Sequence, residues 1–239
     1  MIPKIIHYCW FGRNEKPKLA EKCIRSWHKY CRGYQFIEWN EDNFPIDQYP
    51  YAKFCLEQKR YAFLSDFVRL VVVYENGGIY FDTDVELIRP LDHLLENDAF
   101  FGFETEEYVA TGLGFGAAKG NLLLKEMIDD YADSFAQAKE NYQFIPCPKL
   151  NTRIFLNHGL VQNGEMQNIA GALILPADYM NPYDDPTGRL NKTENTVSIH
   201  WYAKSWMSKR KILRSKLTKP LHRIFGKESL AWLKKKRKS

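Results

Sequence analysis

The sequence lacks several features that would assign it to a particular class. It has no run of about 18 apolar residues, and its amino terminus shows no charged, apolar and cleavage-site succession, so we expect neither a membrane-spanning helix nor a signal peptide. Its five cysteines are odd in number and never spaced as CxxC, which argues against a disulfide framework or a zinc site. We therefore expect reduced thiols and a cytoplasmic protein.

Acidic residues are nearly absent from the end of the chain. Residues 204–239 contain 14 Lys and Arg but one acid, Glu228, whereas the preceding residues contain 20 basic and 28 acidic residues. A body of charge −8 argues against nucleic acid as the main partner. The tail of charge +13 calls for an anionic partner of its own.

The apolar pattern indicates one α/β domain. At 239 residues and 45% apolar content, the chain is long enough for one substantial core. Strand, helix and strand in succession within the first forty residues are typical of an α/β sheet. The predicted strands are 4–11, 34–39, 77–88, 100–103, 112–118, 172–176 and 196–202, and the predicted helices are 16–31, 59–76 and 122–135.

The stretch GGIYFDTDVELI at 77–88 alternates apolar and polar residues, which predicts one strand with Asp82, Asp84 and Glu86 on the same edge. Neighbouring carboxylates either raise each other's pKa or bind a cation. Oxygen ligands suit Mg²⁺ or Mn²⁺ next to a substrate phosphate. The alternative is an exposed polar strand face.

Two further side chains are predicted to lie near these aspartates. Asp66 and Arg69 are three residues apart on the preceding helix and hence share a face. The planar guanidinium of Arg69 could pair with phosphate oxygens, the alternative being a surface ion pair. Trp10 ends the first strand and could stack on a nucleobase, the alternative being core packing.

The segment HWYAKSW at 200–206 ends the last predicted strand with several polar side chains. His200 could bind a Mn²⁺-type ion, Lys204 could meet a phosphate, and Ser205 could donate to an oxygen. A purely structural role for the histidine is the alternative.

The segments IPKIIHYCWFG, SDFVRLVVVYENGGIYFDTDVE and HWYAKSW resemble glycosyltransferase family 32, whose members carry a DXD sugar-binding motif. The resemblance spans about residues 1–206. It implies a GT-A fold in one nucleotide-sugar-binding domain and a retaining transfer of a hexose. The donor would be a nucleotide sugar, with a UDP-sugar favoured, and Mn²⁺ or Mg²⁺ the cofactor. The acceptor would be a saccharide or lipid-linked saccharide, and the process would be the synthesis of a surface polysaccharide such as a capsule.

The resemblance also implies roles for individual residues. Acceptor selection would come from the segment after GLGFG and from a PCPKLNTR loop near Asn151. The implied roles are base stacking by Trp10, donor contacts by Asp66 and Arg69, the DXD pair Asp82 and Asp84, closure over the donor phosphate by Ser205 and Trp206, and a third metal ligand at His200.

The expected chemistry needs no protonating acid, because a cation and Arg69 would absorb the charge on a departing diphosphate. A double displacement would need a carboxylate nucleophile, for which Glu104 is a candidate. Alternatively, the acceptor hydroxyl loses its proton to the departing phosphate.

Residues 207–239 are predicted to form a separate basic tail. Apolar residues at helical spacing among Lys and Arg, with Pro220 as a kink, predict an amphipathic helix on the anionic inner face of the cell membrane. A solvated disordered tail and a nucleic-acid patch are alternatives. The apolar residues are Leu213, Leu217, Leu221 and Phe225.

Two rival functions remain open at this point. The strand IYFDTDV has the DxD of haloacid-dehalogenase phosphatases, but Val85 and Glu86 stand where those enzymes have Gly and Thr. The other rival is a non-enzymatic RNA- or lipid-binding module that acts through the basic tail.

Overall fold

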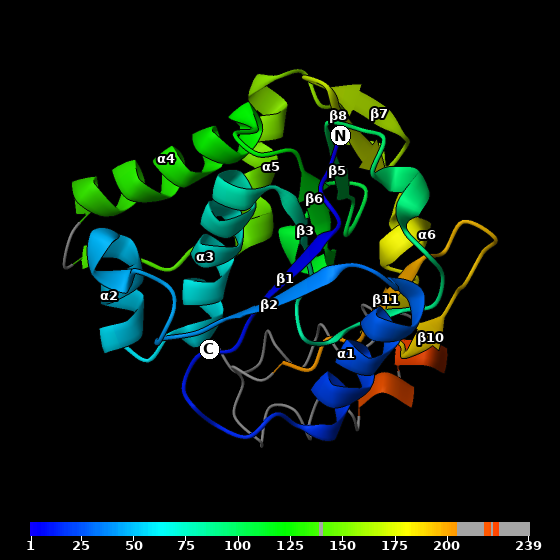
Figure 1. Ribbon diagram of the computed structural model, residues 1–239. Coiled ribbons are helices and arrows are strands. Elements are labelled where there is room, and N and C mark those ends of the chain that lie inside the picture. The colour runs from blue at the N-terminus through cyan, green and yellow to red at the C-terminus, as the bar shows by residue number, and fades with distance from the viewer. Residues whose placement is uncertain (139–140, 205–217, 221, 225–239) are drawn as a thin grey trace, which may run out of the picture.

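The computed structural model describes residues 1–138, 141–204, 218–220 and 222–224 (Figure 1). The main helices are α1 (Lys18–Tyr30), α2 (Pro50–Glu57), α3 (Tyr61–Asn76), α4 (Leu122–Ala138), α5 (Cys147–Asn157) and α6 (Ala177–Met180). The strands are β1 (Ile5–Cys9), β2 (Gln35–Trp39), β3 (Gly78–Tyr80), β4 (Val85–Leu87), β5 (Ala99–Gly102), β6 (Phe115–Ala117), β7 (Gln167–Ile169), β8 (Ala172–Leu175), β9 (Tyr183–Asp184), β10 (Arg189–Leu190) and β11 (Ser198–His200).

Seven strands form one mixed sheet in the order β2-β1-β3-β6-β5-β8-β7. The pairs β1–β2, β1–β3 and β5–β8 are parallel, while β6 runs antiparallel to both β3 and β5. Consequently β1, β3 and β5 point the same way, and the residues that follow them leave the sheet at one edge. Strands β4 and β11 form a separate antiparallel pair.

Helices cover both faces of the sheet (Figure 1). One apolar core joins α2, α3, α4 and α5 to the sheet, and it includes Phe67, Phe101 and Tyr131. A second core joins α1 to β4 and α6, with Trp27 buried at its centre and its indole nitrogen donating to the Val85 carbonyl. The predicted α/β class and all three predicted helices are confirmed.

Two sequence-based predictions of local structure are wrong. Residues 77–88 are not one strand, because the backbone turns at the aspartates: Val85 N–H donates to the Asp82 carbonyl at 3.0 Å. Strand β3 therefore belongs to the main sheet and β4 to the pair with β11. The supposed PCPKLNTR loop is mostly helix α5, whose buried face packs on α4 and contributes Ile154 and Phe155 to the core.

Most of the predicted tail lies outside the described residues, including Leu213, Leu217, Leu221 and Phe225. Residues 218–220 and 222–224 are helical. Lys219 donates to Tyr183 Oη at 2.7 Å and to Asp185 Oδ1 at 3.1 Å. This short piece therefore rests on the β9–β10 hairpin.

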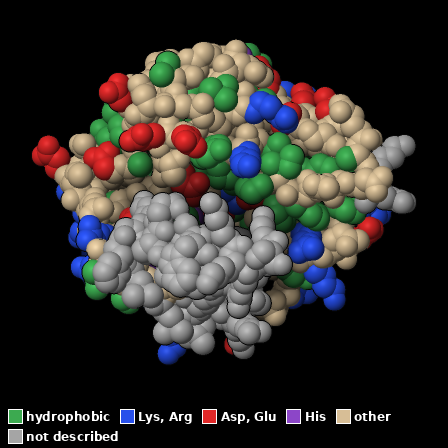
Figure 2. Space-filling view, turned by 180° about the vertical axis from the view of Figure 1, so that it is seen from behind, with side chains coloured by type: hydrophobic (Ala, Val, Ile, Leu, Met, Phe, Trp, Pro, Cys, Tyr) green, Lys and Arg blue, Asp and Glu red, His purple; other side chains and the backbone are tan. Residues whose placement is uncertain are grey.

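No helix among the described residues is both long and apolar enough to span a membrane. All five cysteines are buried and unpaired, as the sequence predicts. Seen from behind, the molecule is hollowed near its centre, with Asp and Glu side chains along one side of the hollow and Lys and Arg along the other (Figure 2).

Candidate active site

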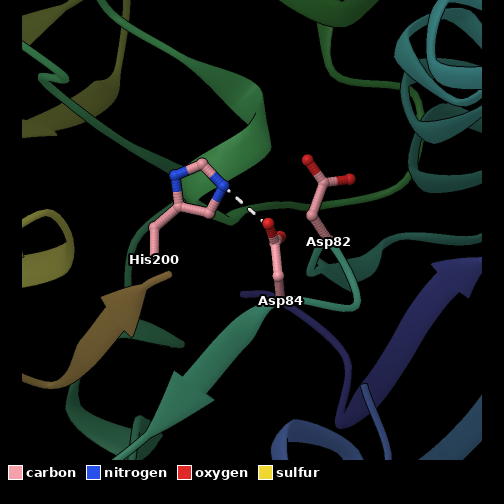
Figure 3. Close-up of side chains that lie close together, drawn as sticks. All are labelled: Asp82, Asp84 and His200. Atoms are coloured by element: carbon pink, nitrogen blue, oxygen red, sulfur yellow. Dashed lines mark ion pairs between the residues drawn. The ribbon is translucent and has the colours of Figure 1, made fainter. Parts of the chain in front are cut away.

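The tight turn after β3 brings the two aspartates of the DTD motif to one place. Asp82 and Asp84 each lie in the turn rather than on a continuous strand. The Asp84 carboxylate faces the His200 imidazole at the end of β11, and the Asp82 carboxylate lies beside this pair (Figure 3). One ligand atom from each of these three residues lies within 4.8 Å of the others. The third acid of the predicted edge, Glu86, is not part of this group and instead binds Lys22 at 2.7 Å.

Asp84 is held by the segment that follows β11. Its Oδ1 is 3.3 Å from His200 Nε2, and its Oδ2 accepts the Ala203 backbone N–H at 2.7 Å. Its backbone carbonyl accepts the Trp201 N–H at 2.9 Å. These contacts fix the relative position of two segments more than 110 residues apart in the chain.

Asp82 is held by buried groups from α3 and β3. Arg69 Nη2 lies 3.0 Å from Asp82 Oδ1 and 2.7 Å from Asp66 Oδ1, which confirms that the α3 pair lies beside the DXD motif. Tyr80 donates its hydroxyl to Asp82 at 3.0 Å, and the Arg69 guanidinium lies over the Tyr80 ring. The Arg69 side chain is only 3% exposed, so its first role is to orient these carboxylates.

The short helix η3 (Thr111–Leu113) forms a wall against this ion pair. Thr111 Oγ1 accepts from Asn151 Nδ2 at 2.9 Å and lies 3.5 Å from Arg69 Nη1. A Cβ added to Gly112 would lie 2.8 Å from Asp82 Oδ2. A side chain at position 112 would therefore force Asp82 or η3 to shift.

Asn151, predicted to bind substrate, is completely buried behind Thr111. The side chain therefore supports the wall of the site and does not face solvent. The sequence could not show this, because the segment looked like a loop rather than a helix packed in the core.

The electrostatics of the three acids differ. Burial raises the pKa of Asp82 to about 6, opposed by Arg69 and reinforced by Asp84. Burial also raises the pKa of Asp66, again opposed by Arg69. For Asp84 the burial effect is outweighed by His200 and by the Ala203 N–H, so its pKa is lowered, and the pKa of His200 is raised despite burial because Asp84 faces it. Asp84 is thus ionised at neutral pH.

These residues fit a divalent cation. Two carboxylates and an imidazole are ligands that Mn²⁺ accepts and Mg²⁺ accepts in part. Ligand atoms on an octahedral ion lie about 3 to 4.2 Å apart, so the spacing within 4.8 Å needs only small side-chain rotations. The buried Nδ1 of His200 has no hydrogen-bond partner among the described residues, so no other described group occupies this nitrogen.

The remaining predicted residues have mixed outcomes. Trp10 follows β1, which is parallel to β3, so it leaves the sheet at the same edge as Asp82; it is half-buried and donates to the Asn14 carbonyl. Lys204 pairs with Asp185 at 2.5 Å. Ser205 and Trp206 lie outside the described residues. Their substrate contacts stay predictions.

Several residues of the site were not predicted from the sequence. Thr111 lies outside the motifs named above, whereas Gly112 lies in GLGFG and Ala203 in HWYAKSW. Their roles could not be predicted, because these depend on contacts across long stretches of chain. Tyr80 did carry a signal, since it alternates with Asp82 and shares its face.

Comparisons with known proteins agree with this geometry. Residues 17–101 match the family model described as "Glycosyltransferase sugar-binding region containing DXD motif". Inositol phosphoceramide mannosyltransferases 3 and 1 of Schizosaccharomyces pombe are 30% and 29% identical over 53% and 44% of this chain. The chain spans only 36% and 35% of these two relatives.

A solved structure, PaToxG Glycosyltransferase, superposes with a TM-score of 0.52 at 17% identity, covering 65% of this chain and 69% of that one. This likeness concerns the fold, which is the GT-A glycosyltransferase fold that the sequence predicts. The sequence match is limited to residues 17–101, which are similar to the sugar-binding region of glycosyltransferases with the DXD motif.

Proposed function

We propose that this protein is a metal-dependent, retaining glycosyltransferase that moves a hexose from a nucleotide sugar to a saccharide or lipid-linked saccharide. The observation that carries the proposal is the convergence of Asp82, Asp84 and His200 beside the buried Arg69–Asp66 pair. A single structural ion pair would not require three ligand-type side chains at the edge where β1, β3 and β5 end.

The chain's own residues have distinct tasks in this reaction. Asp82, Asp84 and His200 would hold Mn²⁺ or Mg²⁺, which when bound neutralises the diphosphate of the donor. Arg69 keeps the Asp66 and Asp82 carboxylates in fixed positions, so that little reorganisation is needed when the donor binds. Asp66, 14% exposed, would accept hydrogen bonds from hydroxyl groups of the donor sugar.

The identity of the sugar is a separate part of the proposal. The two Schizosaccharomyces pombe relatives are named as mannosyltransferases acting on inositol phosphoceramide. The candidate donors are therefore a nucleotide-activated mannose and the UDP-sugar that the family resemblance favours. A lipid-linked acceptor agrees with a basic tail at the inner membrane face, and synthesis of a surface polysaccharide would be the process served.

The substitution Asp84→Asn tests the metal-dependent function. The carboxamide keeps an oxygen for the Ala203 N–H but removes the charge facing the cation, so we expect Mn²⁺-dependent donor binding to weaken about tenfold or more. Thermal stability measured with Mn²⁺ against UDP- and GDP-sugars reports this binding, because a ligand of the native state raises its apparent stability.

Asp92→Asn is the matched control, because this aspartate lies on the surface and pairs with Lys4. The unliganded Asp84 variant should melt cooperatively, as the wild type does. If Asp84→Asn and the wild type show the same donor-induced shift with Mn²⁺, the proposed function is wrong.

A further inference from the structure

A second polar cluster lies directly next to the His200 imidazole. The Tyr202 ring centroid is 4.1 Å from that of His200. Tyr202 Oη lies 3.1 Å from Glu104 Oε1 and also 3.1 Å from Asn181 Oδ1. All three residues of this cluster are half-buried, so none of them is sealed in the core.

The cluster lies on the same edge of the sheet as the DXD motif. Glu104 comes shortly after β5 and Asp82 shortly after β3, and these two strands point the same way because each is antiparallel to β6. Glu104 is also one of the charges that act on His200. The second cluster is therefore continuous with the proposed metal and donor site.

The orientation of the Asn181 amide is fixed by its neighbours. Its Nδ2 donates to the Glu104 backbone carbonyl at 2.9 Å, and a carbonyl oxygen can only accept. The amide oxygen must consequently face Tyr202. The backbone of Glu104 is held in turn, because its N–H donates to the Tyr108 carbonyl at 2.7 Å.

The cluster has more acceptors than donors. A tyrosine hydroxyl carries one proton and can donate it to one oxygen at a time, whereas both the Glu104 carboxylate and the Asn181 Oδ1 only accept. No other hydrogen bond made by the described residues supplies a donor to either atom. Among the described residues, one of these two oxygens is therefore left without a donor and can accept from water or a ligand.

We propose that Glu104 Oε1 and Asn181 Oδ1 form the acceptor subsite of the transferase and bind a hydroxyl group of the acceptor saccharide. This inference rests on the proposed function and names the residues that select its second substrate. A neutral hydroxyl satisfies the missing donor, whereas the Glu104 carboxylate repels the anionic diphosphate of the donor substrate. The subsite thus separates the two substrates by charge.

Binding of methyl glycosides tests the subsite without relying on turnover. The probes are methyl α-mannoside, methyl β-galactoside and methyl β-glucoside, titrated into the full chain with Mn²⁺ and either UDP or GDP and followed by ligand-observed NMR. We expect at least one glycoside to bind. Glu104→Gln should weaken its binding about tenfold, because the new side-chain amide can donate to Asn181 Oδ1 and leaves no unpaired acceptor for the glycoside hydroxyl.

Two variants serve as controls. Glu107→Gln changes the same residue type in the exposed loop three positions along and should leave glycoside binding unchanged. Tyr202→Phe keeps the ring against His200 but removes the competing proton, so it should bind the glycoside at least as tightly as the wild type.

Three outcomes would overturn the inference: no glycoside binds the wild type, Glu104→Gln binds as the wild type does, or Tyr202→Phe loses binding. The donor-induced thermal shift is measured in the same samples. If that shift is present while glycoside binding is unaffected by Glu104→Gln, the acceptor subsite is wrong and the proposed function stands.

Discussion

The contribution of the buried His7 to stability depends on its protonation state. Its side chain is completely buried in β1, and Trp39 Nε1 donates to its Nδ1 at 3.0 Å while its Nε2 faces the Gly77 carbonyl at 2.9 Å. Nδ1 must accept and Nε2 must donate, which fixes the neutral tautomer. Burial lowers the pKa of His7 from 6.5 to about 4, opposed in part by the bond to Gly77.

This predicts a loss of stability in mild acid. The unfolded chain takes up a proton on His7 at pH 6.5 and the folded chain only near pH 4, so the contribution of the neutral ring is complete above pH 6.5 and falls as the pH drops to 4. The loss amounts to about 3 kcal/mol. Urea unfolding at several pH values should therefore show the stability difference between the wild type and His7→Gln shrinking over this range; a constant difference would contradict the prediction.

At the scale of elements, the sequence predicts what depends on local pattern and misses what depends on distant contacts. The apolar periodicity correctly places β1, α1, β2 and α3, because each buries one face next to its chain neighbours. Alternation through 77–88 fails to reveal the turn at Asp82, since the partner of β4 is β11, more than 100 residues later. The aspartates and His200 could nevertheless be named as candidate metal ligands, because their residue types suit a cation; the turn that brings them together could not be predicted.

Gly112 tests how closely η3 must approach the ion pair. A methyl group there would lie 2.8 Å from Asp82 Oδ2 and 3.1 Å from Arg69 Nη1, so Gly112→Ala should displace the carboxylate from its position. We expect Mn²⁺-dependent donor binding to weaken about tenfold, a loss typical of moving a group that orients a metal ligand. The donor-induced thermal shift measures it.

Gly102→Ala is the matched control on β5, because its added methyl group meets Met180 only at 3.4 Å, an ordinary contact distance. This variant should bind the donor as the wild type does. Equal donor binding by Gly112→Ala would mean that η3 can retreat from Asp82 at little cost.

At the scale of the whole molecule, the β9–β10 hairpin contacts both the segment just after β11 and the short helical piece near residue 219. Asp185 in this hairpin pairs with Lys204, just after β11, and with Lys219 of the short helical piece. Arg189 of β10 also donates to the Arg223 carbonyl at 3.0 Å. The described piece of the predicted tail is thus attached to the body of the molecule, and six further Lys and Arg follow residue 224.

Two truncations separate attachment to the body from binding to a membrane. A chain ending at residue 224 keeps the Lys219–Asp185 contact but loses six Lys and Arg, whereas a chain ending at 206 loses both. Each basic residue near an anionic surface contributes about 1 kcal/mol. The chain ending at 224 should therefore bind phosphatidylserine liposomes more weakly than the full chain, and the chain ending at 206 should not bind them. Both should keep the donor-induced thermal shift, because every residue proposed to bind the metal or the donor precedes residue 207. The partly exposed pair at Asp185 is worth at most about 1 kcal/mol, so the chain ending at 206 should melt only slightly lower. Liposome co-sedimentation measures the first expectation, and equal sedimentation of all three chains would show that the basic tail is not the membrane contact.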